Sequence, residues 1–253
     1  MSVRVCLAIV VLTATGISQE TSNEQSVPED ATPLHVLILT GDQHPAHDWK
    51  ETTAALKTIF QADKRFVVQV LDRPEELARH VHETDVIVQN YGPWSEPPPG
   101  SGFRNVLKTF VARGRGIVLI HYANGTFRDW PEYRGKIARR YWIDDTSGHD
   151  PYQEFEVVIR DPDHPITKDL NSFTTTDELY FRQGGAHPVD VLAVARSQVT
   201  GKDEPLVLAY KYHEGRVFQT LLGHDAAALR QPGTAQLIRR GTAWSAKRLT
   251  TDH

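Results

Sequence analysis

Short hydrophobic runs alternate with amphipathic stretches through the first half of the chain, from Leu34 onward. The runs are rich in β-branched residues and carry few charges, so they predict strands, and those that begin near Leu34, Gly116 and Arg216 predict strands buried on both faces of a parallel sheet. The stretches between them repeat hydrophobic residues at helical spacing, which predicts helices. The predicted strands are 35–40, 66–71, 85–90 and 116–120, and the predicted helices are 49–62, 74–81 and 102–114.

The second half of the chain is richer in strands. Segment 127–140 is basic and aromatic and predicts short helical turns. The predicted strands are 154–160, 191–196, 205–210 and 216–221, and a helix over 225–247 closes the pattern. Alternating strands and helices followed by strand-rich additions predict an α/β fold. We expect a flavodoxin-like, doubly wound, mostly parallel sheet with helices on both faces and extra antiparallel strands.

The first 33 residues differ from the rest. Residues 1–18 contain Arg4, an apolar stretch too short to span a membrane and small residues near the end, which predicts a secretory signal peptide. A buried strand or helix is the alternative. Residues 19–33 are polar, acidic and proline-bearing, as in a disordered linker. We therefore expect one domain over 34–250, a secreted or periplasmic location, and no membrane anchor after cleavage.

Charge and cysteine content exclude several functional classes. The formal charge is −4, and the charges are interspersed without a basic stripe, so no nucleic-acid partner is expected. Cys6, the only cysteine, lies in the segment expected to be cleaved. The mature chain would then have no disulfide, thiolate ligand or cysteine nucleophile. The oligomeric state stays open.

Histidines follow several of the predicted strands. His44 and His47 come after 35–40, His121 directly after 116–120, and His224 after 216–221. Ligands bind at the carboxyl ends of strands in an open parallel sheet, so these histidines predict one shared pocket. The alternatives are that His47 supports the following helix with His44 in solvent, and that His121 is a core residue bonded to backbone.

Carboxylates accompany other histidines. The tripeptide Gly-His-Asp occurs at 148–150 and 223–225, and each histidine is a candidate metal ligand or oriented base. Asp225 is also a candidate N-cap of the closing helix. In the segment TTTDELYF, an extended chain would put Glu178 and Tyr180 on one face and Asp177 on the other. The alternative is that the acid forms an ion pair with Arg182.

Motifs of phosphate cofactors and serine hydrolases are absent from the sequence. There is no G-x-S-x-G, no Walker loop and no G-x-G-x-x-G, so no nucleotide cofactor is expected.

Several segments together resemble the ThuA-like, or trehalose-utilisation, family. They are GDQHPAHDW, GIVLIHYANG, SGHDPYQEFEVVIRDPDHPITKDL, TTDELYF and PLVLAYKYHEGRVFQTLLGHD, and they occur in the family's order. The resemblance implies a fold similar to the class I glutamine amidotransferases and a role in using trehalose, sucrose or keto-sugar derivatives. It carries over these positions: His47, His121, His149, Asp177, Glu178, Tyr180, His224 and Asp225. Amidotransferase activity is not expected, because His121 stands where those enzymes have a cysteine.

Three functions fit these residues. The first is an enzyme, a hydrolase, lyase or isomerase, that acts on a small-molecule carbohydrate by acid–base chemistry. Its predicted catalytic residues are His121, His224, Glu178 and Asp177. Its predicted substrate-binding residues are Gln43, His44, His47, Tyr122, Asn124, Tyr180 and Trp94.

The second function is a metal-assisted version of the same enzyme. Zinc or another divalent transition metal would be held by His47, His121, His149 and His224. The third is a non-catalytic carbohydrate-binding or partner-docking domain. Its stacking surfaces would be supplied by Trp94, Trp130, Tyr133 and Trp142.

Overall fold

The computed structural model describes Met1, residues 32–94 and residues 97–249. The predicted signal peptide and most of the predicted linker lie outside the described residues, so both stay predictions. Among the described residues, no helix has the length and apolar character needed to cross a membrane.

Within the described residues, nine strands form one sheet in the order β2-β1-β3-β4-β11-β10-β9-β6-β7, and β5 pairs with β8 separately. The strands are β1 (Leu34–Leu39), β2 (Phe66–Leu71), β3 (Val86–Gln89), β4 (Gly116–Ile120), β5 (Gly148–His149), β6 (Gln153–Ile159), β7 (Phe173–Asp177), β8 (Tyr180–Phe181), β9 (Asp190–Arg196), β10 (Asp203–Tyr212) and β11 (Gly215–Thr220). The α-helices are α1 (Trp49–Gln61), α2 (Ser101–Ala112), α3 (Ala226–Arg230) and α4 (Pro232–Ser245).

The sheet divides into a parallel and an antiparallel part. Strands β2, β1, β3, β4 and β11 run parallel to one another. Strands β10, β9, β6 and β7 extend the sheet antiparallel from β11. The predicted α/β class, a mostly parallel sheet with antiparallel additions, is therefore confirmed.

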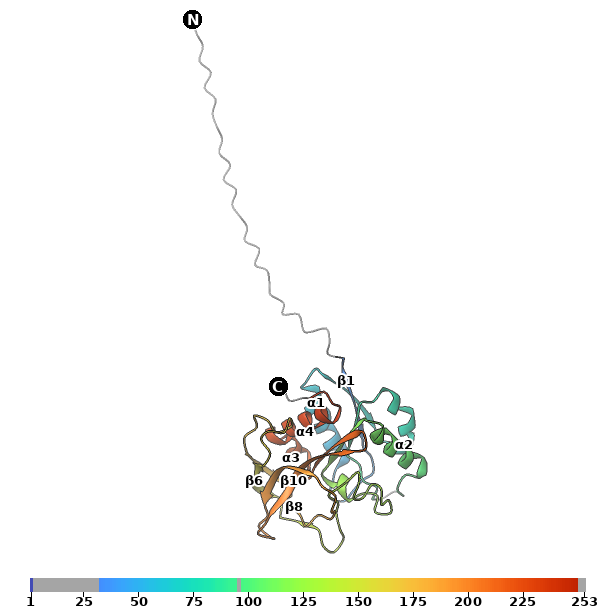
Figure 1. Cartoon of the computed structure of the whole chain (residues 1–253), viewed down its shortest axis with the longest axis vertical. Coiled ribbons are helices and arrows are strands. Elements are labelled where there is room, and N and C mark those ends of the chain that lie inside the picture. The colour runs from blue at the N-terminus through green and yellow to red at the C-terminus, as the bar shows by residue number, and fades with distance from the viewer. Residues whose placement is uncertain (2–31, 95–96, 250–253) are drawn as a thin grey trace. The chain divides into compact units, whose positions relative to one another are not determined.

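Each face of the parallel part packs against its own helices (Figure 1). Val36 and Ile38 of β1 belong to the core that includes α1, α3 and α4. Leu37 and Leu39 of the same strand belong to the core that includes α2 on the opposite face. Successive strand residues point to opposite faces, so a strand covered on both sides needs the continuous hydrophobic run found in the sequence.

Two predicted helices differ from the structure. Segment 74–81, predicted as one α-helix, forms two 3₁₀-helices, η1 (Pro74–Arg79) and η2 (Val81–Glu83). The predicted closing helix is broken into α3 and α4, because Pro232 has no N–H and the preceding Gln231 adopts an extended ψ of 130°. The predicted N-cap is confirmed, since the side chain of Asp225 accepts the N–H of Ala228 at 2.7 Å.

We expect Gly241→Ala to destabilise the fold by up to about 2 kcal/mol. A Cβ atom at Gly241 in α4 would lie 2.4 Å from the ring of Phe218 in β11. Overpacking costs about 1–3 kcal/mol, and only about 1 kcal/mol is recovered from the higher helix propensity of alanine. Gly102→Ala in α2 is the matched control, because nothing lies within 4 Å of its added Cβ. Urea unfolding should show a loss for Gly241→Ala only, and equal stability of the two variants would contradict this packing.

Candidate functional site

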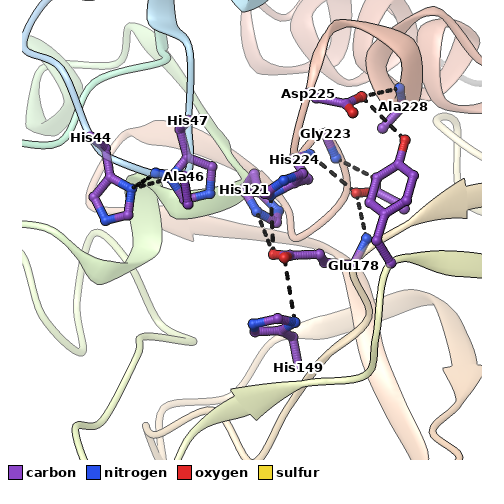
Figure 2. Close-up of polar contacts among 12 residues, drawn as sticks. His44, Ala46, His47, His121, His149, Glu178, Gly223, His224, Asp225 and Ala228 are labelled. Atoms are coloured by element: carbon purple, nitrogen blue, oxygen red, sulfur yellow. Dashed lines mark hydrogen bonds and ion pairs between the residues drawn. The ribbon is translucent and has the colours of Figure 1, made fainter.

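Four side chains from distant parts of the sequence converge at the carboxyl ends of the parallel strands (Figure 2). His47 follows β1, His121 follows β4, and His224 lies between β11 and α3. Glu178 reaches the same place from the connection between β7 and β8. Each residue offers one ligand atom, and these atoms all lie within 4.8 Å of one another. We call these four residues the histidine–glutamate cluster.

His121 is held rigidly at the strand end. Its backbone adopts a φ of 43°, a left-handed conformation that is costly for a residue other than glycine. Its Nδ1 lies 2.7 Å from the carbonyl oxygen of Leu221, which only accepts hydrogen bonds, so Nδ1 carries the hydrogen. In the neutral ring Nε2 is then a bare lone pair. This atom is buried without a hydrogen-bond partner among the described residues.

His44 orients His47 in a comparable way. The backbone N–H of Ala46 donates to Nδ1 of His44 at 3.0 Å, so that nitrogen is an acceptor. Nδ1 of His47 lies 2.9 Å from the same nitrogen and therefore carries a hydrogen. Nε2 of His47 is left bare, buried and without a partner within the described part of the chain. A second partner that fixes the tautomer is typical of metal-ligating histidines.

Glu178 lies at the centre of the other contacts. Its Oε2 is 3.7 Å from Nε2 of His121 and 3.1 Å from Nδ1 of His224. The His224 approach lacks hydrogen-bond geometry, and Nδ1 is buried without a partner among the described residues. With metal–ligand distances of about 2.1 Å, tetrahedral coordination separates two ligand atoms by about 3.4 Å. The two separations from Oε2, 3.1 and 3.7 Å, lie on either side of that value.

The electrostatics of the cluster favour a neutral His47 and an ionised Glu178, whereas the charge of Glu178 favours the protonated form of His224. Burial, followed by repulsion from the other histidines, lowers the pKa of His47 to about 2. Burial opposes ionisation of Glu178, but its interactions with His121 and His224 outweigh burial and lower its pKa. Burial also opposes the charged form of His224, but Glu178 outweighs it and raises the pKa of that ring. His47 and Glu178 are thus held in the forms that bind metals, and a protonated His224 would release its proton on binding one.

We expect the metal-free protein to lose stability below pH 6.5 through His47. The folded pKa of this ring is lowered, so the unfolded chain binds a proton that the folded chain excludes. The cost grows by about 1.4 kcal/mol per pH unit, or about 2 kcal/mol between pH 6.5 and 5. His224 does not add to this loss. Its folded pKa is raised, so its contribution to stability is fully present below pH 6.5 and is lost only as the pH rises.

His47→Gln should remove this part of the pH dependence. Urea unfolding with chelator present, at pH 7 and pH 5, compares wild type and variant. An equal loss of stability in both proteins would contradict the neutral state assigned to His47.

Two cavities adjoin the cluster and share His44, His47 and Tyr122. The smaller, of about 40 Å³, is also lined by His121, His224, Thr52 and Asn90 and has room for about three water molecules. The larger, of about 230 Å³, is aromatic. Its other lining residues are Ala46, Trp94, Arg128, Trp142, His149, Glu178 and Tyr180. The cluster thus lies between a small cavity and a larger one with aromatic walls.

Several predicted site residues lie where the sequence placed them. Trp94, Tyr122 and Tyr180 line the larger cavity. Glu178 and Tyr180 face it together, as the alternation in TTTDELYF predicted. His149, predicted as a metal ligand, lies outside the cluster. Its Nδ1 is 3.4 Å from Oε1 of Glu178, which takes the fourth position in its place.

Other predicted residues serve the structure around the site. Asn124 is buried, donates to Gln183 at 2.6 Å and lines neither cavity. Gln43 donates to the carbonyl groups of His44 and His47 and lines neither cavity. Asp177, predicted as a catalytic acid, is fully buried behind the cluster.

Two of the aromatic residues considered for sugar stacking are not available for it. Trp130 is 8% exposed and Tyr133 is 0% exposed, and both pack in the core beneath α2. Only Trp94 and Trp142 of that group line the larger cavity.

Sequence reasoning missed Asn90, Thr52 and Arg128. Asn90 comes directly after β3, so the strand-end rule that identified His121 also applies to it. Its amide donates to the hydroxyls of Thr52 and Thr53 at 3.0 and 3.2 Å. Arg128 pairs with Asp144 at 2.8 Å, and no local pattern marks it.

Comparison with known proteins gives a consistent result. A family model described as ThuA, trehalose utilisation, matches residues 35–245. The chain is similar to the structure of a putative ThuA-like protein from Parabacteroides merdae, with 26% identity, a TM-score of 0.76 and coverage of 88% of this chain and 93% of that one. A putative ThuA-like protein from Bacteroides uniformis has 18% identity, a TM-score of 0.70 and coverage of 87% and 94%.

A cytoplasmic protein from Salmonella typhimurium shares the fold at 13% identity, with a TM-score of 0.61 and coverage of 84% and 99%. Curated proteins gave no match.

Proposed function

The chain belongs to the ThuA family of trehalose utilisation, and we propose that it is a metal-dependent enzyme acting on a carbohydrate. One observation carries the proposal. Three histidine nitrogens, buried without hydrogen-bond partners among the described residues, converge with the carboxylate of Glu178. Leaving buried polar atoms unpaired is costly, and a bound cation would satisfy all three at once.

The donor set indicates the kind of metal. Nε2 of His47, Nε2 of His121 and Nδ1 of His224 are the nitrogens without hydrogen-bond partners among the described residues, and Glu178 adds an oxygen. Imidazole with one carboxylate suits zinc or a similar divalent transition metal. When bound, such a metal acts as a Lewis acid toward an oxygen atom of the substrate.

The aromatic cavity supports a carbohydrate as the substrate. Trp94 and Trp142 offer apolar ring faces, and sugar rings present flat C–H surfaces that pack on such faces. Trp94 is 52% exposed and lies at the rim, while Tyr180 is 2% exposed and lies deep. A volume of about 230 Å³ is below the range of about 300–1,000 Å³ typical of drug-sized ligands. We infer that one sugar ring occupies the cavity and that the rest of a disaccharide or keto-sugar derivative extends past Trp94.

We propose that His149 and His44, beside the cluster, carry out proton transfer. The ring of His149 is 43% exposed, lines the larger cavity and contacts Oε1 of Glu178. His44 lies at the other side, against Trp94 and Tyr122 with ring centroids 4.4 and 4.7 Å away. Both rings are positioned to exchange protons between a bound sugar and solvent. Amidotransferase chemistry is not expected, since His121, and not a cysteine, follows β4.

The deciding experiment is metal analysis of protein purified without an affinity tag, combined with a turnover screen. We expect about one zinc or other transition-metal ion per chain and conversion of disaccharides or their 3-keto derivatives that stops after chelation. A metal-free sample with full activity would reject the metal. The predicted signal peptide supports a secreted or periplasmic location, and that proposal rests on residues 1–18.

A further inference from the structure

The buried carboxylate of Asp177 accepts backbone hydrogen bonds from two residues of the histidine–glutamate cluster. Asp177, the last residue of β7, is 0% exposed. Its Oδ2 accepts the backbone N–H of Gly223 at 2.6 Å. Its Oδ1 accepts the N–H of His224 at 3.1 Å and that of Glu178 at 2.8 Å. Two of these three N–H groups therefore belong to residues of the histidine–glutamate cluster.

The sheet itself cannot hold these two residues in register. Glu178 follows β7, which is an edge strand, whereas His224 follows β11, near the middle of the sheet. Three other strands lie between β11 and β7, so no backbone ladder joins the two loops. The loop after β11 also turns through Gly223, whose φ of 111° is left-handed. The Asp177 carboxylate supplies the missing connection.

We propose that Asp177 is a positioning residue for the metal centre. Its Oδ1 accepts the N–H groups of both Glu178 and His224 and so fixes their backbones relative to each other. The side chains of these two residues then approach to 3.1 Å, between Oε2 of Glu178 and Nδ1 of His224. The inference rests on the proposed metal-dependent function and deepens it. Partners that orient metal ligands typically contribute about 10- to 100-fold to metal affinity.

Asp150 provides a matched control for a role in folding alone. It is also 0% exposed, and its carboxylate accepts hydrogen bonds from the hydroxyl of Ser197 at 2.7 Å and the N–H groups of Gln198 and Val199 at 2.6 and 3.4 Å. Those groups belong to the turn after β9, which carries no cluster residue. Loss of either carboxylate removes comparable buried hydrogen bonds.

The experiment compares Asp177→Asn, Asp150→Asn and wild type by Co²⁺ titration with a competing chelator, visible absorption of the cobalt-loaded proteins, and thermal unfolding without metal. Both variants are expected to be less stable than wild type. Asp177→Asn should bind Co²⁺ about 10- to 100-fold more weakly, with a shifted absorption band. Asp150→Asn should keep the wild-type affinity and band.

The outcomes separate the inference from the proposed function. If wild type does not bind Co²⁺, the metal centre itself is rejected. If wild type binds and Asp177→Asn binds equally well with the same band, only the positioning role is overturned. Equal weakening in both variants also overturns it, since the effect would then follow from stability. Should Asp177→Asn not fold, Asp177→Glu keeps the charge but not the three bonds, and wild-type affinity in that variant overturns the inference.

Discussion

Replacing His121 by alanine is expected to lower the affinity for Zn²⁺ by more than about 100-fold, because losing even an outer partner of a metal ligand costs about 10- to 100-fold. The ring is 3% exposed, and its Nδ1 is fixed on the carbonyl of Leu221, so the substitution removes a donor that is already positioned. Turnover should fall with the metal. The Zn²⁺ affinity is measured by isothermal titration calorimetry on protein from which metal has been removed with a chelator.

His164→Ala is the control for removal of a half-buried histidine. His164 packs against Trp244 with ring centroids 5.2 Å apart, and its Nδ1 accepts the N–H of Ile166 at 3.2 Å. The His164→Ala variant should be less stable than wild type but should keep the wild-type affinity for Zn²⁺. If both variants bind zinc as wild type does, His121 is a core residue bonded to backbone and the site needs another explanation.

The fold could be predicted because buried parallel strands leave a strong signal. β4 is buried at all five positions, and only a strand covered on both faces requires that pattern. The errors occurred where local chemistry competes with periodicity. Pro232 interrupts a stretch whose hydrophobic spacing continues on both sides, so the α3–α4 break follows from one missing N–H.

The site could be predicted in outline only. The strand-end rule located His47, His121 and His224, because chain direction and strand order determine which edge they share. It could not select Glu178 over His149 as the fourth donor. That choice depends on β5 and β8, which are two residues long and are held by tertiary contacts. The different roles of Asp177 and Glu178, adjacent in sequence, follow from which side chain faces inward.

Glu178→Gln is expected to have the widest effect of any single change in the cluster. The amide keeps the shape of the side chain but removes the charge that contacts His121, His149 and His224. Zn²⁺ affinity should fall by more than about 100-fold, and turnover by about 10²- to 10⁴-fold if proton transfer is also impaired. The pKa of His224 should fall, because Glu178 is what raises it against the effect of burial.

These readouts together distinguish the three functions that the sequence allows. In a metal-dependent enzyme, Glu178→Gln loses metal and turnover together. In a metal-free acid–base enzyme, wild type contains no metal and the variant loses turnover while still binding sugar. In a carbohydrate-binding domain, wild type returns its sugar unchanged and the variant binds it similarly, because Trp94 and Trp142 are intact. Measuring metal content, sugar affinity by calorimetry and product formation on the same two proteins therefore tests the chemistry assigned to Glu178 directly.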